Sequence, residues 1–251
     1  MQLRIGILEC DHVDGDLLNI QGEYSDMFTD LFYSQVDNLT SELDLEVAVY
    51  DLTANHFPIS LDACDAYLIT GSRYGVYDID EVLWLQKAKD LVVKLYEAQI
   101  PTIGICFGHQ LLADSLGGKV EKAQDKGWGV GVHSWQIKDQ KSWMGDHSLS
   151  EFSLLASHQD QVVKLPAGAT LIAGSDFCPI ASFQKGETIL SFQGHPEFSN
   201  EYLSNLIDKR LTRIGEETTL AAKASMNNKI DNQIVGLWML NFLSQKVATN
   251  N

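Results

Sequence analysis

The first half of this chain alternates short, β-branched apolar runs with longer helix-patterned segments, and this alternation limits the fold more than any other feature. Such repetition is typical of βαβ units, in which helices pack on the faces of a parallel sheet. The expected strands lie at Leu3–Leu8, Leu45–Tyr50, Ala66–Thr70 and Pro101–Cys106, and the expected helices at about 23–36, 81–98 and 109–116. The sequence therefore predicts an α/β fold with an open, mostly parallel sheet flanked by helices.

The pattern changes after Gly118. Short alternating segments follow, separated by Gly, Pro and Asp, which is typical of hairpins and makes the complete sheet a mixed one. These segments lie at Val130–Ile137, Thr170–Gly174, Ile180–Phe183 and Thr188–Phe192. From about Asn200 the chain has helical composition, and apolar positions between Ile230 and Phe242 predict a final amphipathic helix. This helical tail either packs against the rest of the chain or makes the contact of a homodimer.

Length and charge exclude several classes of protein. A chain of 251 residues with 45% hydrophobic residues can bury one sizeable core, so we expect a single domain with a core at about 3–201 and a helical extension at about 202–251. A formal charge of −16 argues against nucleic acid as a partner, because phosphate binding needs clustered Lys and Arg. No stretch approaches the roughly 20 apolar residues of a membrane helix, and the strand-like start lacks a signal-peptide layout. We therefore expect no membrane contact and a cytoplasmic protein.

The four cysteines lie far apart in the sequence, at Cys10, Cys64, Cys106 and Cys178. They form none of the close pairs that are typical of metal sites or small disulfide frameworks, so no metal site is expected. No cofactor is expected either. Three of them, Cys10, Cys64 and Cys178, are expected to be small buried hydrophobic residues. Cys106 is different because of its neighbours.

Cys106 lies where an apolar strand meets a helix, in the run PTIGICFGHQLLADSLGG, and is flanked by Gly104 and Gly108. A nucleophile on a sharp strand-to-helix turn has a strained backbone, and its neighbours must be small to avoid the adjacent chain. The turn also brings the sulfur to a helix N-terminus, where the dipole and free N–H groups favour a thiolate and can bind an oxyanion. Cys106 is the candidate nucleophile; the alternative is a buried Cys before a Gly-rich turn.

A cysteine nucleophile needs a general base that is itself oriented by a carboxylate or an amide. The segment TILSFQGHPEFS offers both, because an apolar strand ends just before His195 and Pro196 fixes the chain so that Glu197 can turn back to the imidazole. Cys106, His195 and Glu197 are therefore expected to form a catalytic triad.

Two other histidines are rival candidates. His109 follows Cys106 on the same helical turn, and its direction along the helix makes it a poorer base. His158, in LLASHQDQV, follows an apolar strand and is expected either to line a substrate pocket or to be structural.

The motifs GICFGHQ, at Gly104–Gln110, and GHPE, at Gly194–Glu197, resemble those of the class I (triad) glutamine amidotransferases. Among these enzymes the chain is similar to free-standing relatives of the GMP synthase amidotransferase domain. Supporting segments occur in the same order: YLITGSRYGVYD from Tyr67, GWGVG from Gly127 and SHQDQV from Ser157. The resemblance spans about Leu3–Glu201 and implies a flavodoxin-like glutamine amidotransferase type-1 domain.

The resemblance implies a reaction and roles for individual residues. Cys106 would attack the side-chain amide of glutamine to form a γ-glutamyl thioester, while His195, oriented by Glu197, moves the proton. The backbone N–H of Phe107, with that of Gly71 or Ser72, would form the oxyanion hole. Gln110 matches the position that contacts bound glutamine.

One position departs from the family pattern. Many relatives have Gly-Gly-Pro in the oxyanion loop, and this chain has Gly71, Ser72 and Arg73. Arg73 either binds a substrate carboxylate or faces solvent.

Three functions stay open on the sequence. The first is glutamine hydrolysis that supplies ammonia to a separate synthetase, since the chain has no P-loop or similar ATP-binding motif. The second is a stand-alone γ-glutamyl peptidase or hydrolase, because the same thioester chemistry cleaves γ-glutamyl bonds to other amines. The third is a non-catalytic regulatory protein, against which the complete set of Cys106, His195 and Glu197 argues.

Overall fold

The computed structural model describes residues 2–39, 42–123, 126–146 and 149–249. Within these residues the main sheet has nine strands, which lie across the sheet in the order β2 (Asp44–Asp51), β1 (Gln2–Glu9), β3 (Ala66–Ile69), β4 (Thr102–Ile105), β11 (Ile189–Phe192), β10 (Ser182–Lys185), β9 (Ala169–Gly174), β6 (Gly129–Ile137) and β7 (Glu151–His158). A separate antiparallel pair is formed by β5 (Lys119–Lys122) and β8 (Asp160–Lys164).

The two halves of the main sheet differ in direction. The strands β2, β1, β3, β4 and β11 pair in parallel, and the pairings from β11 through β10, β9, β6 and β7 are antiparallel. The predicted open, mixed sheet is therefore confirmed. Because neighbouring parallel strands end at the same edge, the loops after β1, β3, β4 and β11 meet there, which is where open α/β sheets bind ligands.

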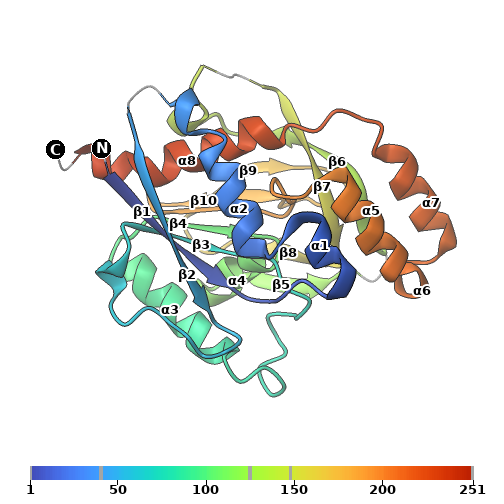
Figure 1. The fold of residues 1–251 in the computed structure, drawn as a ribbon, viewed down its shortest axis with the longest axis horizontal. Helices are drawn as coiled ribbons and strands as arrows, with labels where there is room; N and C mark the ends of the chain where they lie inside the picture. Colours follow the sequence, from blue (N-terminus) through green and yellow to red (C-terminus); the bar gives the residue numbers. More distant parts are fainter. Residues whose placement is uncertain (1, 40–41, 124–125, 147–148, 250–251) are drawn as a thin grey trace.

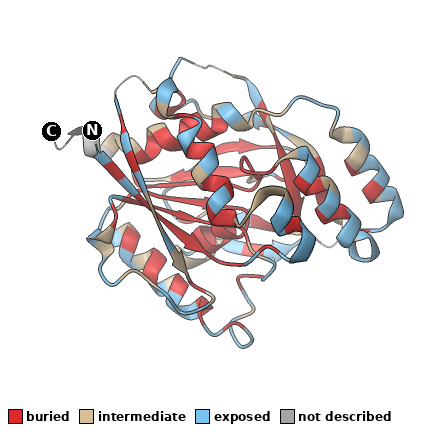
Figure 2. Cartoon of the chain, viewed as in Figure 1, coloured by how far each residue is buried: buried red, intermediate tan, exposed pale blue. Residues whose placement is uncertain are grey.

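Helices cover both faces of this sheet (Figure 1). The structure has α1 (Leu18–Gln21), α2 (Tyr24–Tyr33), α3 (Leu85–Glu97), α4 (Phe107–Ser115), α5 (Asn200–Lys209), α6 (Leu211–Ile214), α7 (Glu216–Ser225) and α8 (Asn232–Thr249), with 3-10 turns at Gly15–Leu17, Val36–Asn38, Leu61–Ala63 and Ser142–Met144. One face packs against α2 and α8, and the other against α3 and α4. The central strands are buried between these layers, while the outer faces of the helices are exposed (Figure 2). Across the described ranges, no helix combines the length and apolar character needed to cross a membrane.

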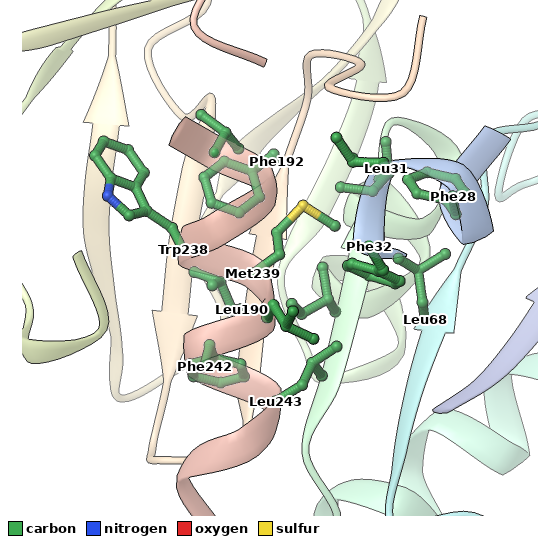
Figure 3. Packing of buried hydrophobic residues seen from close by; sticks show 14 of the residues in the cluster. Phe28, Leu31, Phe32, Leu68, Leu190, Phe192, Trp238, Met239, Phe242 and Leu243 are labelled. Carbon is green, nitrogen blue, oxygen red and sulfur yellow. The ribbon is translucent and has the colours of Figure 1, made fainter. Parts of the chain in front are cut away.

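The side chains of α2, α8 and the sheet face that these helices cover form the largest apolar cluster of the described residues, called below the layer between α2 and α8. Phe28 and Phe32 of α2 and Met239 of α8 pack over the sheet, where they meet Leu190 of β11 (Figure 3). The indole of Trp238 lies in the same cluster, and its Nε1 donates to the carbonyl of Met144 at 3.0 Å. A large aromatic residue is thus buried without an unpaired polar atom.

The prediction that the final helix is amphipathic was wrong. The four consecutive residues Leu237–Leu240 of α8 are all buried, and successive helical residues point in directions about 100° apart. An apolar stripe would leave one of these residues exposed. Instead α8 is covered on several sides, by α2 and the sheet and by the turn that carries Trp143, whose ring lies 6.0 Å from that of Trp238.

Other differences concern the bounds and number of elements. The expected helix at 81–98 begins at Leu85, because the chain from Asp78 to Trp84 forms turns. The strands β5 and β8 were not predicted. Only Val120 of β5 is buried, and the other residues are charged, so this strand has little apolar signal.

Candidate active site

The candidate catalytic residues lie at the carboxyl edge of the parallel strands. Cys106 follows β4 directly, Gly71 lies two residues beyond β3, and His195 lies three residues beyond β11. Since β3, β4 and β11 are neighbours in the sheet, these residues meet although they are far apart in the sequence. The fold thus brings the predicted residues to one place.

Cys106 has a backbone conformation that is rare for a residue with a side chain. Its φ is 53° and its ψ is −101°, at the junction between β4 and α4. The turn is fixed on both sides: the N–H of Cys106 donates to the carbonyl of Phe192 at 2.8 Å, and its carbonyl accepts from Gln110 N. Such a conformation persists only where the surrounding structure holds it, and it is typical of catalytic turns.

The two glycines that flank Cys106 are required by close packing. A Cβ on Gly104 would lie 2.3 Å from the carbonyl oxygen of Gly108, and a Cβ on Gly108 would lie 2.3 Å from that of Ile69. Contacts this short with backbone atoms leave no room for any side chain. The glycine spacing noted in the sequence therefore lets α4 start directly against β3 and β4.

His195 is held on several sides. Its Nδ1 lies 2.7 Å from Oε1 of Glu197, and its ring stacks on that of Phe198 with 4.0 Å between centroids. Its backbone N–H donates to the carbonyl of Leu155, so β7 also fixes this loop. Both His195 and Glu197 are 4% exposed. The remaining ring nitrogen, Nε2, is the one left for Cys106.

Cys106 and His195 are in electrostatic contact. A Cβ built on Gly71 would lie 3.1 Å from Cε1 of His195 and 3.8 Å from Cβ of Cys106, so both side chains border the same small space. Burial alone would lower the pKa of His195, but the negative charges of Glu197 and Cys106 outweigh burial and raise that pKa. The imidazole of His195 therefore holds its proton more tightly than a free histidine does.

A cavity of about 250 Å³ opens above Cys106. The residues that line it lie between positions 72 and 213 of the chain: Ser72, Arg73, Tyr74, Gly75, Tyr77, Asp78, Cys106, Gln110, Lys122, Trp128, Ser157, His158, Gln159, Asp160, Arg210 and Arg213. Gln110 is oriented by two bonds, because its Nε2 donates to the carbonyl of Asp160 and to Oε1 of Gln193. Its own side-chain oxygen remains for a ligand.

His158 is the other predicted pocket residue, and it lines the cavity. Its Nδ1 donates to the carbonyl of Asp160 at 3.1 Å, which makes Nε2 the acceptor nitrogen. Burial lowers the pKa of His158 to about 3, so the ring is neutral near pH 7. Within the described residues Nε2 has no partner.

Arg73 lies in the cavity wall, and its charge is already engaged. Its guanidinium bonds both carboxylate oxygens of Asp11 at 2.9 Å and pairs with Asp14 at 2.9 Å. A further bond reaches the carbonyl of His12. These contacts tie the loop after β3 to the loop after β1.

The predicted oxyanion donors border the same edge. Phe107 is the first residue of α4, so its N–H is one of the helix-terminal donors that no helical carbonyl satisfies. Gly71 lies against His195, as described above. The hydroxyl of Ser72 donates to the carbonyl of Cys10 at 3.0 Å, which anchors the loop that carries Gly71 and Ser72.

The rival residues have other environments. His109 is completely buried, with Nδ1 2.8 Å from the hydroxyl of Ser191 and Nε2 3.2 Å from the carbonyl of Ile180. Burial lowers its pKa to about 3, so His109 is a neutral structural residue. The cysteines outside the site, Cys10, Cys64 and Cys178, are all buried and free.

Sequence reasoning missed several residues of the cavity wall: Tyr77, Lys122, Trp128, Arg210 and Arg213. The two arginines come from the end of α5 and from α6, within the helical extension. One weak signal existed in the sequence, because the chain has only four arginines and two of them are three residues apart.

The comparisons with known proteins concern the sequence and the fold of the chain. Residues 25–212 match the family model described as glutamine amidotransferase class-I. Gamma-glutamyl peptidase 3 of Arabidopsis thaliana is 35% identical over 65% of this chain and 67% of that protein. One subunit of the glutamine-hydrolyzing GMP synthase of Methanocaldococcus jannaschii is 31% identical over 52% of this chain and 68% of that protein. A solved glutamine amidotransferase from Thermotoga maritima has the same fold, with a TM-score of 0.74 and 19% identity over 97% of both chains.

Proposed function

Because this chain belongs to the class-I glutamine amidotransferase family, we propose that its cavity hydrolyses γ-glutamyl amide bonds through Cys106, His195 and Glu197. The chain is a cysteine-dependent hydrolase of the glutamine amidotransferase type. The observation that carries the residue assignment is the position of Cys106, on a strained turn, next to a buried His195–Glu197 pair and in the lining of a cavity.

In the first half of the reaction, the thiolate of Cys106 attacks the γ-carbonyl carbon of the bound substrate. A C–S bond forms, and the negative charge that develops on the carbonyl oxygen is stabilised by the N–H groups of Phe107 and of Gly71 or Ser72. When the tetrahedral intermediate collapses, the C–N bond breaks and the imidazolium of His195 gives its proton to the departing nitrogen. A γ-glutamyl thioester and a free amine or ammonia result.

In the second half, neutral His195 takes a proton from water, and the resulting hydroxide attacks the thioester. The C–S bond breaks, glutamate leaves, and the thiolate and imidazolium are restored. Glu197 keeps the imidazole in one tautomer and orientation and stabilises its charged form, as a triad carboxylate does.

The glutamyl half of the substrate needs polar groups close to Cys106. Gln110 and His158 support this role, because each has an acceptor atom left over after its own bonds to protein are made. Arg73 contributes by holding the loop that carries Gly71 and Ser72, through its pairs with Asp11 and Asp14. The same proposal treats residues 1–251 as one domain, since Arg210 and Arg213 reach the cavity from beyond the expected core.

The leaving group separates two candidate functions. Release of ammonia from glutamine for a synthetase is supported by the similarity to one subunit of a GMP synthase. Release of a larger amine is supported by the similarity to a gamma-glutamyl peptidase and by the extent of the cavity lining, which reaches Trp128 and Lys122.

The test is a comparison of purified protein on glutamine and on γ-glutamyl dipeptides, with a glutamine-like chloroisoxazole or diazoketone as a label for the nucleophile. We expect turnover of at least one substrate type and labelling of Cys106, both lost in Cys106→Ala. Absence of turnover and of labelling would contradict the proposed activity and favour a regulatory role.

A further inference from the structure

The cavity above Cys106 concentrates the arginines of an otherwise acidic chain. The chain has a formal charge of −16 and four arginines, of which Arg73, Arg210 and Arg213 line this cavity. Lys122 adds a fourth cation to the lining. Such enrichment in an acidic protein indicates that the cavity receives an anionic ligand.

The cations in the lining differ in whether a carboxylate of the protein pairs with them. Arg73 pairs with Asp11 and Asp14. In contrast, Lys122, Arg210 and Arg213 have no carboxylate within 4.0 Å among the described residues. The carboxylates that do line the cavity, Asp78 and Asp160, accept bonds from Gly75 N and the Tyr77 hydroxyl. The charge of Lys122 also acts on the carboxylate of Asp160. Arg210 and Arg213 are therefore the two cations of the described lining that have no carboxylate partner.

This balance does not match glutamine, which carries one α-ammonium and one α-carboxylate. If each of these groups found an opposite charge in the lining, a cation would remain without a partner. A γ-glutamyl peptide has an additional carboxylate at the end of its leaving group and a net charge of about −1 near pH 7. Such a ligand uses the remaining cation.

Arg213 has the position expected for this contact. It is exposed, and its guanidinium carbon Cζ lies 5.3 Å from the centroid of the Trp128 ring, which also lines the cavity. Arg210 is less exposed, and its Nη1 donates to the hydroxyl of Ser157 at 2.9 Å, beside His158. Stacking holds the planar guanidinium of Arg213 while leaving its edge free for a carboxylate.

We infer that Arg213 binds a carboxylate on the leaving group, so that the preferred substrate is a γ-glutamyl peptide with a free C-terminus. This inference rests on the proposed function, because it concerns the leaving group of the same thioester reaction. Lys122, which is exposed on β5 and lines the same cavity, assists electrostatically. Arg213 is thus a specificity-determining residue that the extension contributes to the site of the core.

The experiment compares two substrates that differ in one charge, γ-glutamylglycine and γ-glutamylglycinamide. For the wild-type protein we expect kcat/KM to be higher for the acid by roughly twofold to fivefold, the worth of one ion pair at an exposed site. Arg213→Gln should remove this preference, because it should raise KM for the acid more than KM for the amide. Arg213→Lys should restore part of the preference, because it keeps the charge but loses the bidentate geometry.

Arg4→Gln is the matched control. Arg4 is the one arginine that does not line the cavity; it lies on β1 and is 4.0 Å from Glu46. This variant loses the same charge from the molecule, so it should keep the wild-type preference.

The outcomes separate the two levels of the proposal. Equal loss for both substrates in Arg213→Gln, or no preference in the wild-type protein, would overturn the role of Arg213 while leaving the γ-glutamyl hydrolase intact. No turnover of either substrate or of glutamine, together with an unacylated Cys106, would overturn the proposed function and this inference with it.

Discussion

The carboxyl edge of the sheet and the layer between α2 and α8 are built on the same strands, but they differ in backbone strain and in the pairing of buried polar atoms. At the edge, Cys106 has a strained backbone, and buried polar atoms of Glu197, His158 and Gln193 lack partners among the described residues. In the layer, the indole nitrogens of Trp143 and Trp238 both have acceptors. Strain and unpaired polar atoms cost stability, whereas satisfied, close-packed side chains supply it.

This difference shows that the groups available to bind a ligand lie at the edge and not in the apolar layer. The apolar layer is built from closely packed side chains, and of its buried indole nitrogens only that of Trp135 lacks an acceptor among the described residues. The contribution of the layer is therefore rigidity. The edge leaves acceptors and cations that a γ-glutamyl substrate can pair, and the stability supplied by the layer allows that arrangement to persist. Variants in the two regions should therefore separate activity from stability.

The largest effect on activity is expected for Cys106→Ala. Removal of the sulfur eliminates the covalent route, so kcat/KM should fall by about 10⁴-fold or more. The free energy of unfolding should change by less than about 1 kcal/mol, since the side chain is small and the strained backbone is kept. Steady-state kinetics and urea titration measure the two quantities. Retention of more than a few per cent of activity would show that another residue is the nucleophile.

Glu197→Gln should reduce the rate by about 10³-fold to 10⁴-fold and change its pH dependence. The charge of Glu197 raises the pKa of His195, so its loss lowers that pKa and the imidazolium gives up its proton at lower pH. The alkaline limb of the kcat/KM profile should therefore move to lower pH, by about one unit or more. An unchanged alkaline limb in this variant would argue that Glu197 does not set the protonation of His195.

Trp238→Ala should affect stability and leave the chemistry intact. The indole is completely buried, so truncation should lower the free energy of unfolding by about 3–5 kcal/mol. At a temperature where the variant is still folded, kcat/KM should stay within about threefold of wild type. Leu220→Ala is the control, because Leu220 is 66% exposed on α7 and its truncation should cost less than about 0.5 kcal/mol. A large fall in kcat/KM of folded Trp238→Ala would show that the layer and the edge are coupled.

Much of the sheet and of the site could be predicted because local patterns encode them. The strands β1, β3 and β4 are short apolar runs. The strand-to-helix turn has no room for side chains at Gly104 and Gly108, and these two glycines are visible in the sequence. The proximity of His195 and Glu197 also has a local cause, since they are two residues apart and Pro196 lies between them.

Other features depend on the folded chain and have no local pattern. Helix α8 is buried on several sides because other elements pack around it. The spacing of its apolar residues in the sequence could not predict this burial. Arg213 and Trp128 are in contact although 85 positions separate them in the sequence, and no sequence spacing predicts this contact. The pairing of Arg73 with Asp11 is of the same kind, because it requires β1 and β3 to be neighbours.

The most direct test of the account is the mass of the intact protein after reaction with γ-glutamylglycine and an acid quench in the steady state. We predict a fraction of the protein with the added mass of one γ-glutamyl group, located on the peptide that contains Cys106 and absent from Cys106→Ala. Turnover with the acyl group on Cys10, Cys64 or Cys178, or turnover by Cys106→Ala at the wild-type rate, would contradict the assignment of Cys106 as the nucleophile.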